Sequence, residues 1–348
     1  MIARCAALLA AMSLLVQPAA SQAPHVRPNG PLPAALHTLL ATEVKLTAGE
    51  MGTLASGAPV SKMLDADPSR EVALFGGTWI DATPADYVNA VKDIERFEHG
   101  DGFLITKRIS DPPRLEDFDR LDLPESDIAD LKTCRVGDCE LKLAESALDR
   151  ARREIDWSKP SAASDVEALA RRLALEYVAA YQHGGNGELA VYRDAARPTF
   201  VAREFESLIA RTPSLNHVPE LRAYLLDYPR ATLASSTSFF YWHKVKFGLK
   251  PTVRINHVVI QERPDVVLIA IKQLYASHYF WTALQLQALV PDRSDGRGFW
   301  LINVSRSRSD GLGGFVGRLI RSKVTSEAQR GMAAALAAAK ATLEGRAR

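Results

Sequence analysis

The residues best suited to acid–base chemistry lie in the last third of the chain, where His243, His257 and His278 fall on three separate segments. An imidazole takes up or releases a proton near neutral pH, and a tyrosine hydroxyl beside it can assist. His257 and Tyr275 are expected on neighbouring strands, where they can pair as acid and base. His278 and Tyr279 are adjacent on one strand and should point to opposite faces, which argues against that pair.

No sequence motif assigns these groups to a particular reaction. The sequence contains no Gly-x-Ser-x-Gly elbow, no His-Glu-x-x-His pair, no phosphate-binding loop and no dinucleotide fingerprint. The glycines after His183 follow a helical stretch and predict a helix end, because a phosphate loop requires a strand before it. We therefore expect no metal and no cofactor, leave the catalytic residues unassigned and favour a non-enzymatic role.

Two cysteines, Cys134 and Cys139, are close in sequence, with Gly137 and Asp138 between them. Glycine and aspartate favour a turn, which brings the two Cα atoms within bridging distance. Redox pairs prefer two intervening residues, and a metal site lacks further ligands at a suitable spacing. The pair is therefore expected to form a local structural disulfide, which an oxidising compartment favours.

Residues 1–23 have the three-part pattern of a secretory signal peptide. Arg4 precedes an uncharged apolar run over residues 6–16, which is too short to span a bilayer, and small residues gather around Ser21. We expect cleavage within a few residues of this point, which also removes Cys5. The mature protein is therefore predicted to be periplasmic or secreted.

The composition is that of an ordinary globular protein. The chain has 348 residues, of which 47% are hydrophobic and 24% are charged. Lysine and arginine number 43 against 41 acidic residues, which gives a net charge of +2. Nucleic-acid binders usually carry a strongly basic face or segment, so no nucleic acid is expected as a partner.

The chain after the signal divides into three zones. Residues 24–69 are expected to form a linker and a short helical segment. Residues 71–80 are apolar and β-branched enough to predict a strand. Thr83 and Pro84 then predict a helix start, because threonine caps free amides and proline fits the first helical turn. Alternation predicts a further strand over residues 103–109.

The other two zones differ in their period. From about residue 141 to residue 232, apolar residues repeat at helical spacing, which predicts a helical scaffold. Five segments beyond it alternate and are joined by short turns, which indicates an antiparallel meander. The predicted strands cover residues 239–247, 252–261, 266–277, 279–290 and 299–308. A glycine-rich stretch then leads into one long helix, whose apolar face is expected to cover a sheet.

The order of these elements resembles the START-like superfamily, which has the helix-grip fold and includes lipid-transfer proteins, polyketide cyclases and related binders of hydrophobic ligands. One part of the resemblance is residues 72–108, where a strand, the sequence Ala-Thr-Pro-Ala, a helix and a second strand follow in turn. The other is residues 299–305, followed by the glycine-rich linker and the final helix. Residues 70–348 would then form one α+β domain, interrupted at about 141–232 by a helical insertion that departs from the family pattern.

The resemblance implies a curved antiparallel sheet wrapped around the C-terminal helix. The sheet and helix would enclose an apolar cavity for a hydrophobic or amphipathic small molecule, such as a lipid. Polar side chains on the predicted strands are candidates for the cavity lining. These candidates are His257, Gln273, Tyr275, His278 and Tyr279. Which sheet face lines the cavity stays open at this point.

The stretch before the final helix is a candidate for transient contact with a membrane surface. Leu312, Phe315 and Val316 are apolar residues among glycines, and Arg318 and Arg321 follow closely. Such a loop could touch an anionic surface and open the cavity. A flexible connector followed by a solvated basic helix start is the alternative interpretation of the same residues.

Three functions fit the sequence, and we favour the first. It is a carrier or sensor that binds a hydrophobic or amphipathic small molecule. The second is an enzyme of the same fold, such as a cyclase or hydrolase, in which histidine and tyrosine groups of the cavity act as acid and base. The third is a protein-interaction module that uses the helical insertion as its contact surface.

Overall fold

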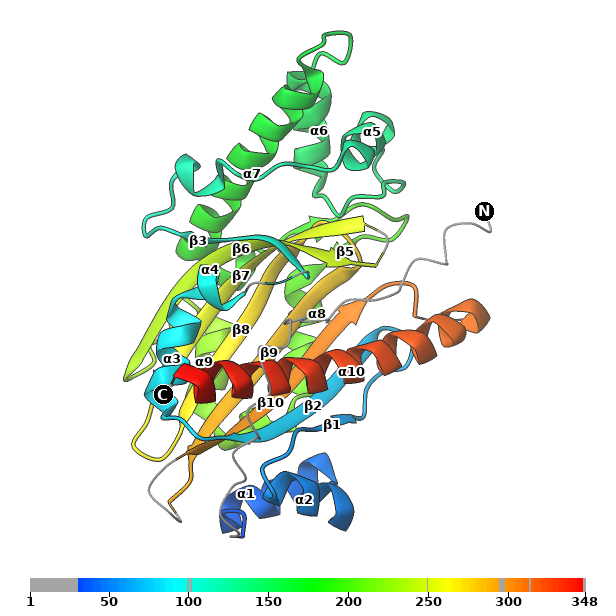
Figure 1. Ribbon diagram of the computed structural model, residues 1–348. Coiled ribbons are helices and arrows are strands. Elements are labelled where there is room, and N and C mark those ends of the chain that lie inside the picture. The colour runs from blue at the N-terminus through cyan, green and yellow to red at the C-terminus, as the bar shows by residue number, and fades with distance from the viewer. Residues whose placement is uncertain are drawn as a thin grey trace.

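The computed structural model describes residues 31–98, 100, 102–248, 250–293, 298–312 and 314–346, of which residues 314–320 and 346 are described by their backbone alone. The predicted signal peptide lies outside these residues. Within them the fold is α+β, with helices on both faces of one large antiparallel sheet (Figure 1).

The sheet has eight strands in the order β1-β2-β10-β9-β8-β7-β6-β3. The strands are β1 (Val60–Met63), β2 (Glu71–Ile80), β3 (Phe103–Ile109), β6 (Ser236–Phe247), β7 (Lys250–Glu262), β8 (Val267–Ala276), β9 (Phe280–Pro291) and β10 (Phe299–Ser309). All neighbouring pairs are antiparallel. The predicted meander is therefore confirmed. A separate small sheet pairs β4 (Val191–Tyr192) with β5 (Thr199–Phe200).

One face of the sheet is covered by α3 (Pro84–Lys92), α4 (Ile94–Phe97) and the long α10 (Gly314–Arg346). Figure 1 shows α10 running across the strands of the sheet. The predicted start of α3 is confirmed, because the Thr83 hydroxyl accepts a hydrogen bond from the Asp86 amide. The Asp86 carboxylate in turn accepts one from the Thr83 amide, which completes a capping box.

A glycine lets α10 approach the sheet closely. A Cβ atom at Gly76 of β2 would lie 2.6 Å from the Met332 side chain, so any larger residue would displace that side chain. The strand β2 continues through Gly76 and Gly77 without interruption. The apolar face of α10 then buries Met332 and Leu336 against Leu74 and Val258 of the sheet.

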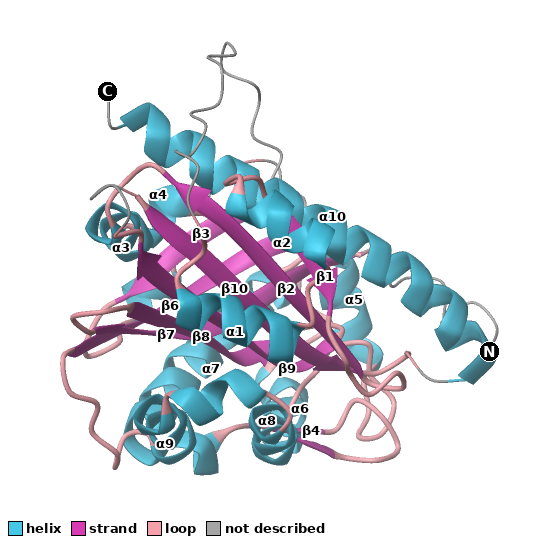
Figure 2. Cartoon of the chain, turned by 90° about the horizontal axis from the view of Figure 1, so that it is seen from below, coloured by secondary structure: helices cyan, strands magenta, loops and turns pink. Residues whose placement is uncertain are grey.

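The opposite face is covered by helices that lie in the chain between the neighbouring strands β3 and β6. They are α5 (Glu125–Thr133), α6 (Glu145–Glu154), α7 (Ala162–Gly184), α8 (Val201–Ala210) and α9 (Pro219–Asp227), with the short 3₁₀ helices η3 (Leu115–Phe118), η4 (Gly185–Glu188) and η5 (Pro213–His217). Figure 2 shows α7, α8 and α9 on the side of the sheet away from α10. Val178 of α7 packs with Trp242, and Phe205 of α8 packs with Val259. The helical middle zone is thus a second layer on the sheet.

The N-terminal helices form a smaller cluster on β2 and β10. They are α1 (Ala34–Leu39), the π-helix η2 (Leu40–Val44) and α2 (Ala48–Ala55). Leu40 and Leu54 are completely buried there with Phe75 and Trp300. The short helical segment predicted in this zone is therefore confirmed, with a second helix after it.

The structure joins Cys134 and Cys139 by a disulfide bond, between α5 and α6. Gly137 has a positive φ of 88°, which glycine adopts without strain and which allows the predicted turn between the two cysteines. Among the described residues, no helix combines the length and apolar character that crossing a bilayer would require.

Candidate ligand-binding cavity

A cavity of about 300 Å³ lies between the sheet and the helices α3, α4 and α10. Its walls come from β2 and from β6 to β10 on one side and from the three helices on the other. Small-molecule sites in proteins usually measure about 300–1,000 Å³, so this cavity can hold a small ligand.

The helical wall of the cavity is mainly apolar, with Arg96, Glu327 and Thr342 as its polar members. α3 contributes Tyr87 and Val91, and α10 contributes Met332 and Leu336, all of which are buried. Residues four positions apart share one helix face, so each pair faces the sheet together. Leu74 of β2 packs in the same cluster. This side of the cavity therefore suits hydrocarbon.

The sheet wall carries a polar stripe along β9 and β10. Gln285 faces Ser305 across the strand pair, and Gln287 faces Asn303, and all four line the cavity. The Oε1 of Gln287 and the Oδ1 of Asn303 are buried and have no hydrogen-bond partner among the described residues. Because buried polar groups are normally paired, these oxygens are suited to the hydroxyl or amide groups of a bound molecule or to ordered water.

An acid–histidine pair occupies one end of the cavity. The carboxylate of Glu98, directly after α4, lies 2.7 Å from Nδ1 of His243. It also accepts hydrogen bonds from the hydroxyl groups of Tyr241, at 2.9 Å, and Thr106, at 3.1 Å. The Glu98 and His243 side chains are only 13% and 5% exposed. Because a carboxylate only accepts, Nδ1 of His243 is the donor and carries a proton.

The second ring nitrogen of His243 has a different environment. Its Nε2 lies 3.5 Å from the Nδ2 amide donor of Asn256, so in the neutral ring this nitrogen is the acceptor. A histidine held at Nδ1 by a carboxylate is oriented to act as a base at Nε2. Burial, and then the Glu98 carboxylate, raise the pKa of Tyr241 well above its usual value, so its hydroxyl keeps its proton.

Arg254 faces His243 across the β6–β7 pair and also lines the cavity. Its Nε donates a hydrogen bond of 2.8 Å to Oε1 of Gln273. Burial lowers the pKa of Arg254 from its ordinary value. That value is so high that an arginine nevertheless stays protonated in a protein. This end of the cavity therefore holds both the Arg254 cation and the Glu98 carboxylate.

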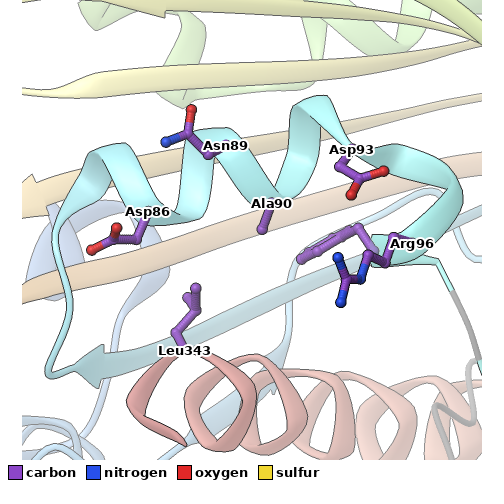
Figure 3. Close-up of a pocket in the computed structure, with 7 residues that line it drawn as sticks. Asp86, Asn89, Ala90, Asp93, Arg96 and Leu343 are labelled. Carbon is purple, nitrogen blue, oxygen red and sulfur yellow. The ribbon is translucent and has the colours of Figure 1, made fainter. Parts of the chain in front are cut away.

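A second hollow, of about 250 Å³, adjoins the cavity between α3 and the last turns of α10 (Figure 3). It shares Ala90 and Leu343 with the cavity lining, and Figure 3 shows these two side chains pointing toward one another from the two helices. Asp86, Asp93 and Arg96 give it a polar rim. We interpret this hollow as the opening of the cavity to solvent.

The predicted pair His257 and Tyr275 lies on the other face of the sheet, against the helical insertion. His257 places Nδ1 3.4 Å from the Tyr181 hydroxyl of α7. Tyr275 packs edge-on against Tyr177 and Tyr192, with ring centres 6.2 Å apart in both cases. Neither residue lines the cavity beneath α10.

A β-bulge explains the position of Tyr275. The register pairs Ile255 with Tyr275 but Asn256 with Gln273, which leaves Leu274 without an opposing residue. One extra residue reverses the alternation beyond it. Gln273 therefore lies on the cavity side of the sheet with Asn256 but does not line the cavity, whereas Tyr275 faces the insertion, although strict alternation predicts one face for both.

The other two predicted cavity residues lie beyond the end of β8 and hold surrounding segments in place. Nε2 of His278 lies 2.8 Å from a carboxylate oxygen of Asp127, and Nδ1 lies 3.1 Å from the carbonyl oxygen of Glu140. The Tyr279 hydroxyl accepts a hydrogen bond from the Lys250 amide at 3.1 Å. Their contacts are thus with neighbouring segments of the chain, and neither lines the cavity.

The predicted membrane-contact residues are described only in part. Leu312 is 1% exposed and lines the cavity. Arg321 donates a hydrogen bond of 2.6 Å to the carbonyl of Glu71. The side chains outside the described part are those of Phe315, Val316 and Arg318. Membrane contact by this segment stays a prediction.

Sequence reasoning missed Glu98, Tyr241 and Arg254 as site residues. A partial signal existed in the sequence. Tyr241 and His243 are two residues apart on one predicted strand and therefore share a face, and Arg254 lies on the next predicted strand, where it pairs with His243. Glu98 ends a helix far earlier in the chain, and no local pattern links it to these strands.

No group of three or more histidine, cysteine or acidic side chains in the described part of the chain is arranged to hold a metal ion. The sequence matches no protein-family model, and a comparison with curated proteins found no match. Inference about function therefore depends on the cavity itself.

Proposed function

We propose that the protein binds or transfers a hydrophobic or amphipathic small molecule, such as a lipid, in the cavity beneath α10. The observation that carries this proposal is the contrast between the two walls. Hydrocarbon from α3 and α10 faces amides and hydroxyls on β9 and β10. A core that is merely packed rarely leaves buried amide oxygens unpartnered, whereas an amphipathic ligand satisfies both walls.

The order of the elements supports the resemblance to the START-like superfamily. β2 is followed by α3 and α4, then by β3, the meander β6 to β10 and the final helix α10. α10 covers the sheet face that carries the cavity. We accordingly assign the helix-grip fold, with the helices between β3 and β6 as an insertion that covers the opposite face.

Two substitutions on α10 test whether the cavity is the binding site. Ala335 lines the cavity, whereas Ala337 is exposed on the same helix. Ala335→Trp should fill the space and weaken binding of the neutral dye Nile red by at least about tenfold, which corresponds to about 1.4 kcal/mol. Ala337→Trp should bind like the wild type. Equal binding by the two folded variants would exclude the cavity as the site.

The natural ligand can be sought by native mass spectrometry of the protein purified from its own secretory compartment. A discrete adduct that extracts into organic solvent as a lipid would support the proposal and identify the ligand. A clean apo mass, together with no uptake from added lipids, would contradict it.

The Glu98–His243 pair favours one second candidate, an enzyme of the same fold such as a cyclase or hydrolase. Nε2 of His243 would take a proton from a ligand in the cavity while Glu98 stabilises the charged ring. His243→Ala should then lower turnover of the extracted ligand by about 10²–10⁴-fold. His257→Ala serves as the control, because His257 lies on the other face of the sheet. Turnover that His243→Ala leaves unchanged would exclude this candidate.

A further inference from the structure

The cavity contains a cation, Arg254, that forms no direct ion pair with the described residues, although the charge of the Glu98 carboxylate favours it from beyond ion-pair distance. Nε of Arg254 donates to Gln273, and the guanidinium lies 5.1 Å from the centre of the Phe280 ring. No carboxylate in the described part of the chain forms an ion pair or hydrogen bond with Arg254. Its two terminal amino groups are therefore available to a bound molecule.

Two other arginines of the sheet follow the opposite pattern. Arg306 and Arg308 of β10 are almost completely buried on the face away from the cavity, and both bind the carboxylate of Glu71. Arg308 also binds Glu204 at 2.7 Å. A charge withdrawn from water is costly unless it is paired. By this comparison, the protein leaves the partner of Arg254 to be supplied from outside.

The carboxylate at this end of the cavity is already engaged. Glu98 accepts hydrogen bonds from His243, Tyr241 and Thr106 and forms no ion pair with Arg254. On the other side of the guanidinium, the Oε1 of Gln273 accepts from Arg254, so its Nε2 is a donor. That Nε2 is buried and has no partner among the described residues. Gln273 does not line the cavity, so it holds the guanidinium in place, and the two terminal amino groups of Arg254 suit an anionic oxygen.

We propose that Arg254, held in place by its hydrogen bond to Gln273, binds the carboxylate of an amphipathic acid whose hydrocarbon chain lies against α3 and α10. This inference rests on the proposed function and names the class of ligand. A guanidinium can donate two parallel hydrogen bonds to a carboxylate, which a hydroxyl or an ammonium group cannot accept in the same way. The cavity volume of about 300 Å³ favours a chain of medium length.

The test compares dodecanoate with dodecan-1-ol, which has the same chain length and no charge. Each displaces Nile red from the full-length mature protein at a pH where the acid is ionised. The variants are Arg254→Gln, which keeps hydrogen-bond donors but loses the charge, and Arg222→Gln on α9. Arg222 is exposed, so this control removes the same charge from the molecule without touching the cavity.

The wild type should bind dodecanoate at least about tenfold more tightly than dodecan-1-ol, because hydrogen bonds between charged groups are stronger than those between neutral groups. Arg254→Gln should lose this preference and keep its affinity for the alcohol, and Arg222→Gln should retain both affinities.

Two results would overturn the assignment of the carboxylate site but leave the proposed function intact. One is equal wild-type affinity for the acid and the alcohol, and the other is a preference for the acid that survives in Arg254→Gln. If the wild type binds neither ligand nor the dye, the proposed function and this inference both fail. The wild-type comparison is decisive even if Arg254→Gln does not fold.

Discussion

Nε2 of His278 lies 2.8 Å from Oδ2 of Asp127, and the two side chains are 4% and 1% exposed. Nδ1 of the same ring lies 3.1 Å from the carbonyl oxygen of Glu140. A carbonyl and a carboxylate both accept, so both ring nitrogens face acceptors, and the imidazole bridges Asp127 and Glu140. This buried pair fastens α5, next to the disulfide, to the end of β8.

Breaking this pair should destabilise the fold strongly. His278→Leu leaves the buried Asp127 carboxylate with Lys250 as its remaining cation, 3.7 Å away. Removing one partner of a buried pair typically costs about 3–5 kcal/mol of unfolding free energy. The double variant His278→Leu/Asp127→Leu should recover part of that loss, which urea unfolding of all four proteins measures. Strictly additive effects in this cycle would contradict the pairing.

Lys272 should make the fold less stable as pH falls. Its side chain is completely buried against the insertion. The Nζ atom donates hydrogen bonds to the Tyr181 hydroxyl, at 3.0 Å, and to Oδ1 of Asn186. No carboxylate among the described residues pairs with it. Burial lowers the pKa of Lys272 well below its usual value. The unfolded chain binds this proton below about pH 10.4, so stability attributable to Lys272 decreases as pH falls below that value.

Lys272→Met should remove this dependence. Between about pH 7 and 9, the wild type should gain up to about 1.4 kcal/mol of unfolding free energy per pH unit relative to the variant. Chemical denaturation at several pH values gives the two slopes. Parallel slopes would show that Lys272 remains charged in the folded protein.

His257 should contribute acid sensitivity of the same sign at lower pH. Burial, and then Lys272, lower the pKa of His257 to about 3. The unfolded chain binds this proton below about pH 6.5, so the stability associated with neutral His257 is lost as pH falls from there toward 3. The ring stacks on Phe240 with centres 4.4 Å apart, and its Nε2 has no partner among the described residues.

His257→Phe should therefore be tolerated at neutral pH and protective in acid. The quantity to compare is the unfolding free energy of the variant minus that of the wild type. This difference should be about 2 kcal/mol larger at about pH 4.5 than at pH 7. Thermal or urea unfolding at the two pH values measures this. A wild type and variant that lose stability equally would refute the assignment to His257.

Local sequence patterns predicted the elements well because their causes are local. The Thr83 and Asp86 capping box is contained within one helical turn, and the apolar and β-branched content of β2 is a property of that strand alone. The short turns between β6 and β10 likewise dictated an antiparallel meander, which the sheet order confirms.

The site was less predictable because it depends on relationships between distant segments. The periodicity along β8 does not predict the β-bulge at Leu274. This bulge nevertheless places Gln273 and Tyr275 on opposite faces of the sheet. The choice of cavity face depends on which layer α10 covers and which the insertion fills. Glu98 reaches His243 only once α4 packs beside β3 and β3 pairs with β6, so only the assembled fold brings these residues together.

Two glycines just after α7 should respond differently to substitution. Gly185 should not tolerate a side chain, whereas Gly187 should. Gly185 has a φ of 63°, and a Cβ atom there would lie 1.7 Å from the carbonyl oxygen of Tyr228. Gly185→Ala should cost about 2–4 kcal/mol, because backbone strain adds to displacement of the segment after α9. A Cβ atom at Gly187 would have no neighbouring atom within 4 Å, so Gly187→Ala should change stability by about 0.5 kcal/mol or less. Urea unfolding compares the two, and equal stability would contradict this close contact between α7 and the chain that follows α9.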